Sequence, residues 1–173
     1  MASILRFDNW QNSDGTSIAT TDASGNISFA GSGAGKILQI VTGTTATEVA
    51  TTANTNVSTG LTATITPTSA SSTIFAIMTA SFTIEAASTF VNTTIFRGTI
   101  ASGVNLASPQ PVLGITYSAS TTGGPRFQMT TFASDSPATT SATTYTGAFA
   151  SANGKVCKGG NNPAKMILLE VSA

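Results

Sequence analysis

The sequence predicts an all-β fold, a jelly-roll-like antiparallel β-sandwich preceded by an extended N-terminal segment. Three observations support this prediction. Short stretches alternate apolar and polar residues with a period of two. Clusters of Gly, Pro, Asn and Asp separate these stretches at regular intervals, and no segment has a convincing 3.6-residue period. Two packed antiparallel sheets bury the apolar faces of such strands.

The first 35 residues differ from the rest of the chain. They contain two glycine turns, in SDGTSI and ASGNIS, and end in the small-residue sequence AGSGAGK. Their apolar residues are too few and too scattered to offset the entropy of ordering the segment alone. We therefore expect residues 1–35 to be an extended segment that needs another surface, with a Gly/Ser hinge at Ser32–Gly35, and residues 36–173 to be the β-sandwich body.

The first two strands of the body lie in KILQIVTG and GLTATITP. The first is a run of apolar residues. In the second, Leu61, Ala63 and Ile65 fall on one face and threonines fall on the other. This alternation predicts a strand with one buried face.

The longest apolar stretch is STIFAIMTASFTIEA. Its opposite face begins with Phe75 and Ile77 and then carries hydroxyl groups, so we expect the first end of this strand to be covered on both sides. The core-facing residues of this strand are predicted to be Ile74, Ala76, Met78, Ala80, Phe82 and Ile84.

The remaining strand-like stretches bring the expected number of strands in the body to eight or nine. The final stretch, MILLEV, is almost continuously apolar and is predicted to be a central strand. Most aromatic residues fall on strands and are expected in the core, whereas Tyr117 and Tyr145 are the better surface candidates because of their polar tips. The other stretches are STFVNTTIFRG, TIASG, QPVLGITYSA, PRFQMTTFAS and TTYTGAFAS.

Charged residues make up only 8% of the 173 residues, with seven positive and seven negative charges. No basic face for a nucleic acid is expected. Serine and threonine supply roughly three residues in ten, so the surface is rich in hydroxyl groups and poor in charge, which suits a protein held in a large assembly. The one cysteine, Cys157, excludes an intrachain disulfide.

The residues that carry chemistry are sparse. There is no histidine and there are only seven carboxylates, so we expect no enzyme activity. GSGAGK departs from a phosphate loop, because Ala30 and Ile37 stand where glycine and a hydroxyl residue are required. WQNSDG departs from a calcium loop, because Trp10 holds the first ligand position. We expect no metal and no cofactor.

The sequence also gives no membrane or export signal. No run of 18 apolar residues occurs, so no membrane insertion is expected. The N-terminus lacks an apolar run followed by a small-residue cleavage site, so no secretory signal is predicted.

Several stretches resemble one known group of proteins. ILRFDNWQNSDGTSI resembles the N-terminal segment of fibre-like virion proteins of tailed bacteriophages, especially phages of aquatic bacteria, in which an apolar-Asp-x-x-Gln-x-x-x-Gly pattern recurs. The body is similar to a module of the same proteins over GKILQIV, TGLTATITPTSASSTIFAIMTASF, SDSPATTSATTYTG and MILLEVSA. The resemblance implies a structural protein on the exterior of a virion, made in the host bacterial cytoplasm, with a compact β body that forms a homotrimer.

The chain departs from this group at two points. Trp10 stands where a smaller aliphatic residue is usual, and there is no long fibrous shaft. A stubby appendage or a capsid decoration protein then becomes plausible beside a tail fibre. The expected partners are further copies of the chain and the capsid, collar or tail proteins.

The N-terminal segment holds the candidate docking residues Leu5, Phe7, Trp10 and Gln11, because buried aromatic residues dominate interface energetics. The alternative is that this segment packs on its own body.

A second hypothesis is a receptor-binding module for host glycans. Its candidate loops lie around Asn105, Thr121–Pro125 and Asn161–Pro163, which are polar but offer no clear aromatic platform.

Overall fold

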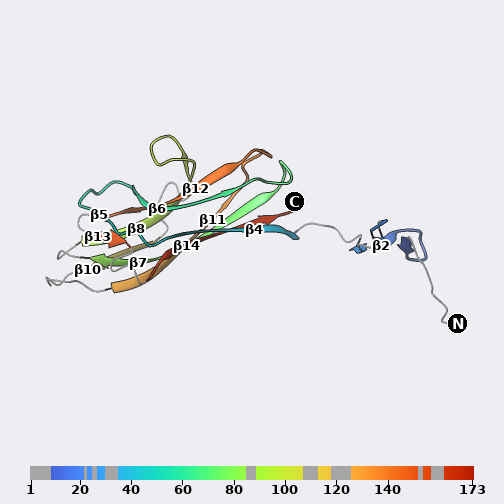
Figure 1. Ribbon diagram of the computed structural model, residues 1–173, viewed down its shortest axis with the longest axis horizontal. Helices are drawn as coiled ribbons and strands as arrows, with labels where there is room; N and C mark the ends of the chain where they lie inside the picture. The colour runs from blue at the N-terminus through green and yellow to red at the C-terminus, as the bar shows by residue number, and fades with distance from the viewer. Residues whose placement is uncertain are drawn as a thin grey trace. The chain divides into compact units, whose positions relative to one another are not determined.

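The computed structural model describes residues 9–21, 23–24, 27–29, 35–84, 89–106, 113–117, 126–151, 154–156 and 162–173. The described residues form fourteen β-strands and no helix (Figure 1). The chain divides into two compact units, Met1–Lys36 and Ile37–Ala173, and each unit is described by itself. The strands are β1 (Asn9–Gln11), β2 (Ser17–Thr21), β3 (Ile27–Phe29), β4 (Ile37–Thr45), β5 (Val49–Thr51), β6 (Val57–Ile65), β7 (Thr73–Ile84), β8 (Thr89–Arg97), β9 (Val104–Asn105), β10 (Leu113–Tyr117), β11 (Arg126–Asp135), β12 (Thr143–Ala150), β13 (Gly154–Val156) and β14 (Ala164–Val171).

The N-terminal unit contains a three-stranded antiparallel sheet in the order β1-β2-β3. Asn12 and Asp14 shape the turn between β1 and β2. The Asn12 Oδ1 atom accepts hydrogen bonds from the N–H groups of Asp14 at 3.2 Å and Thr16 at 2.9 Å. Gly15 has a φ of 85°, which a side chain would disfavour. The Asp-Gly pair therefore marks a tight turn, as the sequence predicts.

The body consists of two antiparallel sheets, and the predicted jelly-roll-like antiparallel β-sandwich is confirmed. Sheet 1 has the strand order β10-β8-β12-β6, with β9 paired to β8. Sheet 2 has the order β4-β14-β7-β13-β5, with β11 paired to β7. β13 and β14 follow one another along the same edge of β7, opposite β11.

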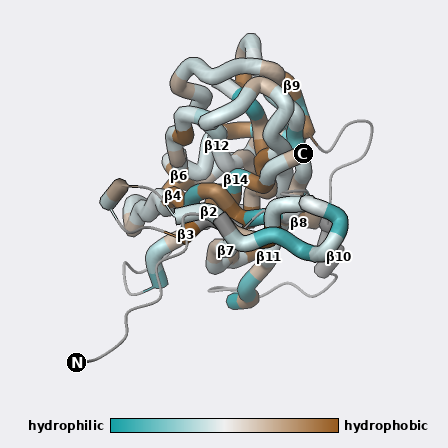
Figure 2. Tube along the Cα trace, turned by 90° about the vertical axis from the view of Figure 1, so that its right-hand side faces the viewer, coloured by the Kyte–Doolittle hydropathy of each residue, from teal (hydrophilic) through white to brown (hydrophobic). Residues whose placement is uncertain are grey.

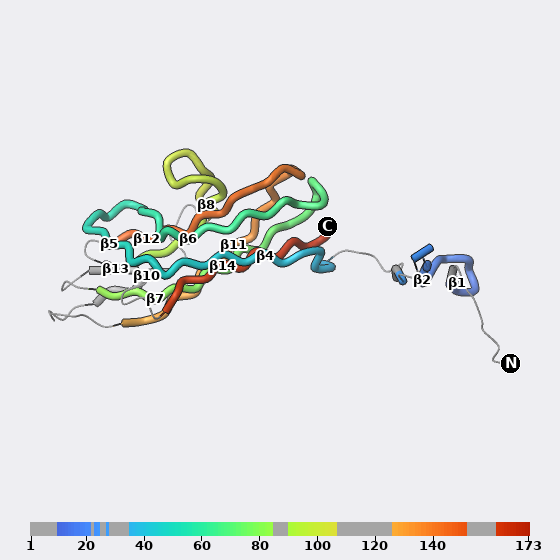
Figure 3. The backbone as a smooth tube through the Cα atoms, viewed as in Figure 1, coloured from blue at the N-terminus to red at the C-terminus, as the bar shows by residue number. Residues whose placement is uncertain are grey.

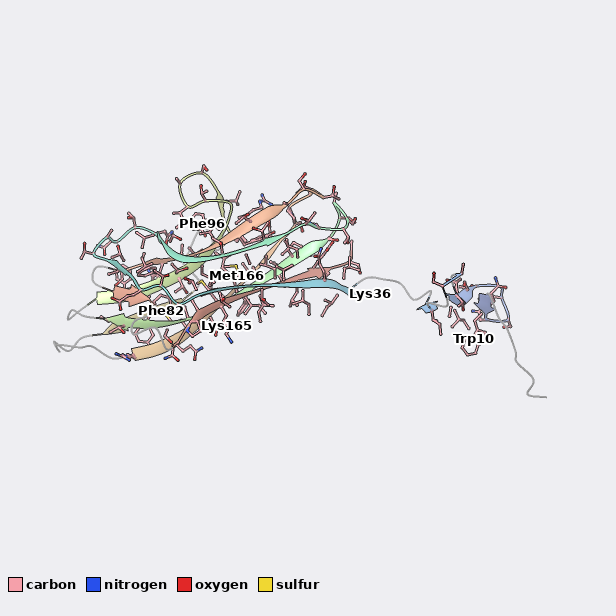
Figure 4. All side chains as sticks on the ribbon, in the orientation of Figure 1. Trp10, Lys36, Phe82, Phe96, Lys165 and Met166 are labelled. Atoms are coloured by element: carbon pink, nitrogen blue, oxygen red, sulfur yellow. The ribbon has the colours of Figure 1, made fainter. Side chains whose placement is uncertain are left out.

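The core lies between the two sheets and follows the predicted period of two. Every predicted core residue of β7 is buried, and so are Leu61, Ala63 and Ile65 of β6. The ring of Phe82 stands 5.7 Å from the ring of Phe149, which places sheet 2 against sheet 1. Figure 4 shows Phe82 within the body.

β14 is central in sheet 2, as predicted, because it pairs with β4 on one side and β7 on the other. It also alternates in burial. Met166 is completely buried and points between the sheets, whereas Lys165 is exposed and points away from them (Figure 4). Ile167 is on the outer face and is 37% exposed. The nearly continuous apolar run therefore has residues on two faces, and the described residues of the body cover only one of them.

Two expectations about individual side chains are wrong. The first end of β7 is predicted to be covered on both faces. However, Phe75 lies on the outer face of sheet 2 and is 42% exposed, because no further layer of the described body covers this face. Tyr145 was expected at the surface, but it is completely buried. Its hydroxyl group donates a hydrogen bond to Asp135 Oδ2 at 2.8 Å, so its polar tip is satisfied internally.

β4 lies beside β6 (Figure 3), and at Gly43 the two strands approach so closely that a side chain does not fit. A Cβ atom on Gly43 would stand 2.0 Å from the carbonyl oxygen of Thr62. This contact joins the edge of sheet 2 to the edge of sheet 1. Glycine is the residue that allows this approach.

Candidate functional site

Trp10 is presented on the surface of the N-terminal sheet. It lies on β1 opposite Ala19 of β2, and its side chain is 61% exposed (Figure 4). The register shifts between Trp10 and Gln11, so the strand is irregular at the two candidate docking residues that the structure describes. Gln11 is also exposed. The other two candidates, Leu5 and Phe7, lie outside the described residues.

Few apolar side chains are buried among the residues of the N-terminal sheet whose exposure is described. Ala19 is buried, but Ile18 is 44% exposed and Ile27 is 63% exposed. A small sheet of this kind gains stability from packing on another surface. Trp10 has the largest side chain available for such a contact.

The turn beside Trp10 uses its polar groups internally. Asp14 Oδ1 accepts a hydrogen bond from the Thr16 N–H at 2.8 Å. Hydrogen bonds from the side chain and the N–H of Thr16 lower the pKa of Asp14 below its ordinary value. These oxygens therefore fix the turn that holds β1 against β2, which is a structural role.

An asparagine-lined cleft lies on sheet 1. It has a volume of about 370 Å³, and its walls come from the segment after β5, from β8, from β9 and from the end of β12. The Thr94 hydroxyl donates to Asn105 Oδ1 at 2.6 Å, which fixes one of the amide groups. The residues that line this asparagine cleft are Asn54, Thr55, Asn56, Asn92, Thr94, Asn105 and Ala150.

A second cleft of about 320 Å³ lies over sheet 2. Gln128 Nε2 donates to the Thr79 hydroxyl oxygen at 3.0 Å, so the floor is polar. A hollow of about 220 Å³ shares Gln128 and two other residues with this cleft and adds Arg126, Thr83 and two phenylalanines. The residues that line the larger cleft are Thr79, Ser81, Gln128, Asn162, Pro163 and Lys165.

The described residues of the predicted glycan-binding loops line two different clefts. Asn105 lines the asparagine cleft on sheet 1, whereas Pro163 lines the cleft over sheet 2. Thr121–Pro125 and Asn161 lie outside the described residues. The other asparagines of the first cleft were not anticipated, because they come from segments far apart in the sequence and no local pattern joins them.

The buried ionisable groups are held in hydrogen-bonded networks that connect strands. Asp135 accepts hydrogen bonds from Arg97 Nη1 at 3.0 Å and from the Tyr145 hydroxyl. Burial and the Asp135 carboxylate together raise the pKa of Tyr145 well above its ordinary value. This network joins β8, β11 and β12, and so ties sheet 1 to sheet 2.

Glu170 is the centre of the second network. It is completely buried and accepts a hydrogen bond from Gln39 Nε2 at 2.6 Å and two from Thr68 at 2.7 and 2.8 Å. Burial raises the pKa of the Glu170 carboxyl, but these hydrogen bonds outweigh burial and lower the pKa from 4.5 to about 2. The carboxylate therefore joins β14 to β4 and to the segment that follows β6.

Within the described ranges, no group of three or more His, Cys, Asp or Glu residues is placed to hold a metal ion. Cys157 lies outside these ranges.

The described part of the chain contains no helix of the length and apolarity that a membrane crossing requires.

Comparisons with known proteins give matches among solved structures. No protein-family description and no curated protein matches the chain. The infectious bursal disease virus VP2 subviral particle matches 85% of this chain with 11% identity and a TM-score of 0.45. The Gt strain of the same virus matches 78% of this chain with 13% identity and a TM-score of 0.39, and the Gx strain matches 86% with 12% identity and a TM-score of 0.39. The chain spans 35%, 36% and 40% of the lengths of these viral chains, respectively.

Proposed function

We propose that this chain is a structural component of a tailed-phage virion, a short trimeric appendage that attaches through its N-terminal segment and displays a β-sandwich head on the exterior of the particle. The observation that carries this proposal is the presentation of Trp10, which is 61% exposed on a small sheet that belongs to a separate unit from the body. A large exposed aromatic residue beside Gln11 suits a docking surface on another virion protein.

The resemblance to fibre-like phage proteins supports the same proposal, since the pattern that carries it, from Phe7 through Gln11 to Gly15, surrounds Trp10. The low charge of the chain, 8% of its residues, also suits close contact with neighbouring proteins. The described carboxylates of the two buried networks are occupied in joining strands. The proposed function is therefore assembly.

The test is to substitute Trp10→Ala in the full chain and measure its occupancy on phage particles by quantitative mass spectrometry. The matched control is Val104→Ala, because Val104 is an apolar residue of the body with a similar exposure of 49%. We expect Trp10→Ala to lower occupancy while the thermal unfolding of the body is unchanged. Equal occupancy of both variants would refute docking by Trp10.

Two further outcomes identify the alternatives. If Trp10→Ala lowers the melting temperature of the body, the segment packs on its own body. If the chain lacking residues 1–35 still assembles on particles, attachment lies elsewhere. Cryo-EM of intact particles distinguishes a tail or collar appendage from a capsid decoration protein.

Binding of host glycans is a second candidate function, favoured by the asparagine cleft. Amide groups donate and accept hydrogen bonds and so complement sugar hydroxyls. The volume of about 370 Å³ lies within the range of small-ligand sites. No aromatic residue lines this cleft, so any binding depends on hydrogen bonds.

A glycan array with the full chain tests this second function. Asn54→Ala should reduce any signal, because Asn54 is an exposed residue of the asparagine cleft. Asn162→Ala in the other cleft is the control. A blank array, or a signal that Asn162→Ala alone abolishes, would exclude the asparagine cleft as a glycan site.

A further inference from the structure

The outer face of sheet 2 carries apolar side chains in two adjacent rows. In the first row, Phe132 of β11, Ile77 of β7 and Ile167 of β14 occupy paired positions. In the second row, Phe75 of β7, Leu169 of β14 and Ile40 of β4 occupy paired positions. These six residues are called the apolar face below. Their alternation with the buried residues of the same strands places all six on the side opposite the core.

The apolar face is exposed to a degree that the core of the sandwich is not. Phe132 is 69% exposed, Ile40 is 59% exposed and Phe75 is 42% exposed. Ile37 and Leu38 at the start of β4 are also exposed. Figure 2 shows hydrophobic stretches of the tube beside the labels of β4 and β14. These apolar residues contrast with their neighbours on the same side of the sheet, because threonine and serine hold most of the other outward positions of β7 and β11.

The exposed area matches what a stable interface between copies needs. The exposed parts of the six side chains together give roughly 500 Å² of apolar surface. This area is at the upper end of what a monomer usually exposes in one patch. A standard interface buries about 800 Å² on each partner, of which about 65% is apolar in homodimers. The required apolar area is therefore about the area that this face offers.

The absence of charge on this face favours a second copy as the occupant. Neither row contains an ionisable residue, so the same face on two molecules can meet without repulsion between like charges. On the outward side of β14, the nearest charged residue is Lys165, one outward position beyond Ile167. A charged partner protein would therefore find no residue of opposite charge within the two rows.

Among the body residues whose side-chain exposure the structure describes, those outside sheet 2 offer no comparable apolar face. The one large hydrophobic residue of similar exposure among them is Val104 of β9. A contact between copies that buries this face on both molecules uses the same surface of each one. Two sheet faces can pack in this way at the separation of about 10 Å that β-sandwiches use.

We propose that copies of this chain associate through the apolar face of sheet 2. The assignment rests on the proposed function for its biological meaning, since it names the surface through which the appendage assembles. The geometry itself depends only on the register and exposure of the six residues.

The test is the native mass of the full chain, measured by analytical ultracentrifugation over a range of concentrations. The wild-type chain should be an oligomer, and the double variant Ile40→Lys/Phe132→Ser should be a monomer with an unchanged far-UV CD spectrum. The matched control is Val104→Lys, which places a charge at an exposed apolar position of sheet 1 and should keep the oligomer. A monomeric wild-type chain, or a double variant that retains the oligomer, overturns the proposal.

A second measurement requires no variant. Hydroxyl-radical footprinting of the wild-type chain should show that Phe75 and Phe132 become protected as the concentration rises, while Val104 remains reactive. Constant reactivity of both phenylalanines in the oligomer overturns the proposal. A dimer formed through this face would refute the trimer of the proposed function and support the present assignment. Loss of particle occupancy by Trp10→Ala with an unchanged native mass separates attachment from self-association.

Discussion

Replacing Glu170 by glutamine should lower the free energy of unfolding at neutral pH and reduce its dependence on acid pH. The buried carboxylate accepts hydrogen bonds from Gln39 and Thr68, and these lower its pKa from 4.5 to about 2 despite the opposing effect of burial. One pKa unit corresponds to about 1.4 kcal/mol, so the lowered pKa corresponds to about 3 kcal/mol of stability at neutral pH. A glutamine amide in this place would direct an N–H group at other donors.

The sign of the pH dependence follows from the direction of the pKa change. Because the pKa of Glu170 is lower in the folded state, its stabilisation is complete above the unfolded-state value of 4.5 and is lost as the pH falls toward about 2. The difference in stability between wild type and Glu170→Gln should therefore be largest at neutral pH and should shrink in acid.

Urea denaturation followed by far-UV CD, at neutral pH and at about pH 3, measures this difference. Glu48→Gln is the matched control, because it removes one carboxylate from an exposed position in the connection between β4 and β5. If wild type and Glu170→Gln lose stability in parallel from neutral to acid pH, the reasoning from the Glu170 network is refuted.

Three further predictions concern contacts inside the sandwich, each measured by urea or thermal unfolding. Gly43→Ala should cost about 3 kcal/mol or more, because its Cβ would stand 2.0 Å from a backbone oxygen of β6, and an unchanged stability would show that the strands separate easily. Thr93→Val and Thr131→Val should each lower the free energy of unfolding by about 1–3 kcal/mol, because each leaves one hydroxyl of a buried hydrogen-bonded pair without its partner. The double variant should be close to wild type in stability, and additive losses in the double variant would contradict this pairing. Tyr145→Phe should cost about 1–3 kcal/mol because it removes a hydrogen bond to the largely buried Asp135 carboxylate, and a neutral effect would argue against that network.

The faces of the long strands were predictable from the sequence, because burial follows the local period of two. Leu61 and its alternate neighbours on β6 are buried, and so are the six predicted residues of β7. The short strands β5, β9 and β13 were not predicted. Strands of two or three residues contain too few alternations to produce a periodic pattern, and they form because longer neighbours offer hydrogen-bonding edges.

The exposure of single side chains was less predictable, because it depends on what lies beyond the strand. Phe75 and Phe132 belong to strands with regular alternation, yet the sequence does not state whether another layer covers the outer face. Phe132 does give one signal, since it falls on the hydroxyl-bearing side of its strand rather than the core side. Tyr145 was misjudged because its polar partner, Asp135, lies on a different strand.

The asparagine cleft could not be predicted for a related reason. Its residues come from separate strands and segments. The pairing of β8 with β9 and β12 brings together the asparagines of β8 and β9, and the segment after β5 adds the others. The docking residues are the opposite case. Trp10 and Gln11 are adjacent in the sequence, so a local pattern sufficed to single them out, and their attachment role stays a prediction.

The uncharged rows of sheet 2 imply an unusual response to the solution environment. Dissolved salt weakens contacts between charges by screening them, and these rows contain no charges to screen. Copies joined through Phe132, Ile40 and their neighbours should thus remain associated in both fresh and saline water. Cooling acts in the other direction, because the transfer of apolar surface out of water becomes less favourable at low temperature. Temperature rather than salinity would then set the limits within which such an assembly holds together.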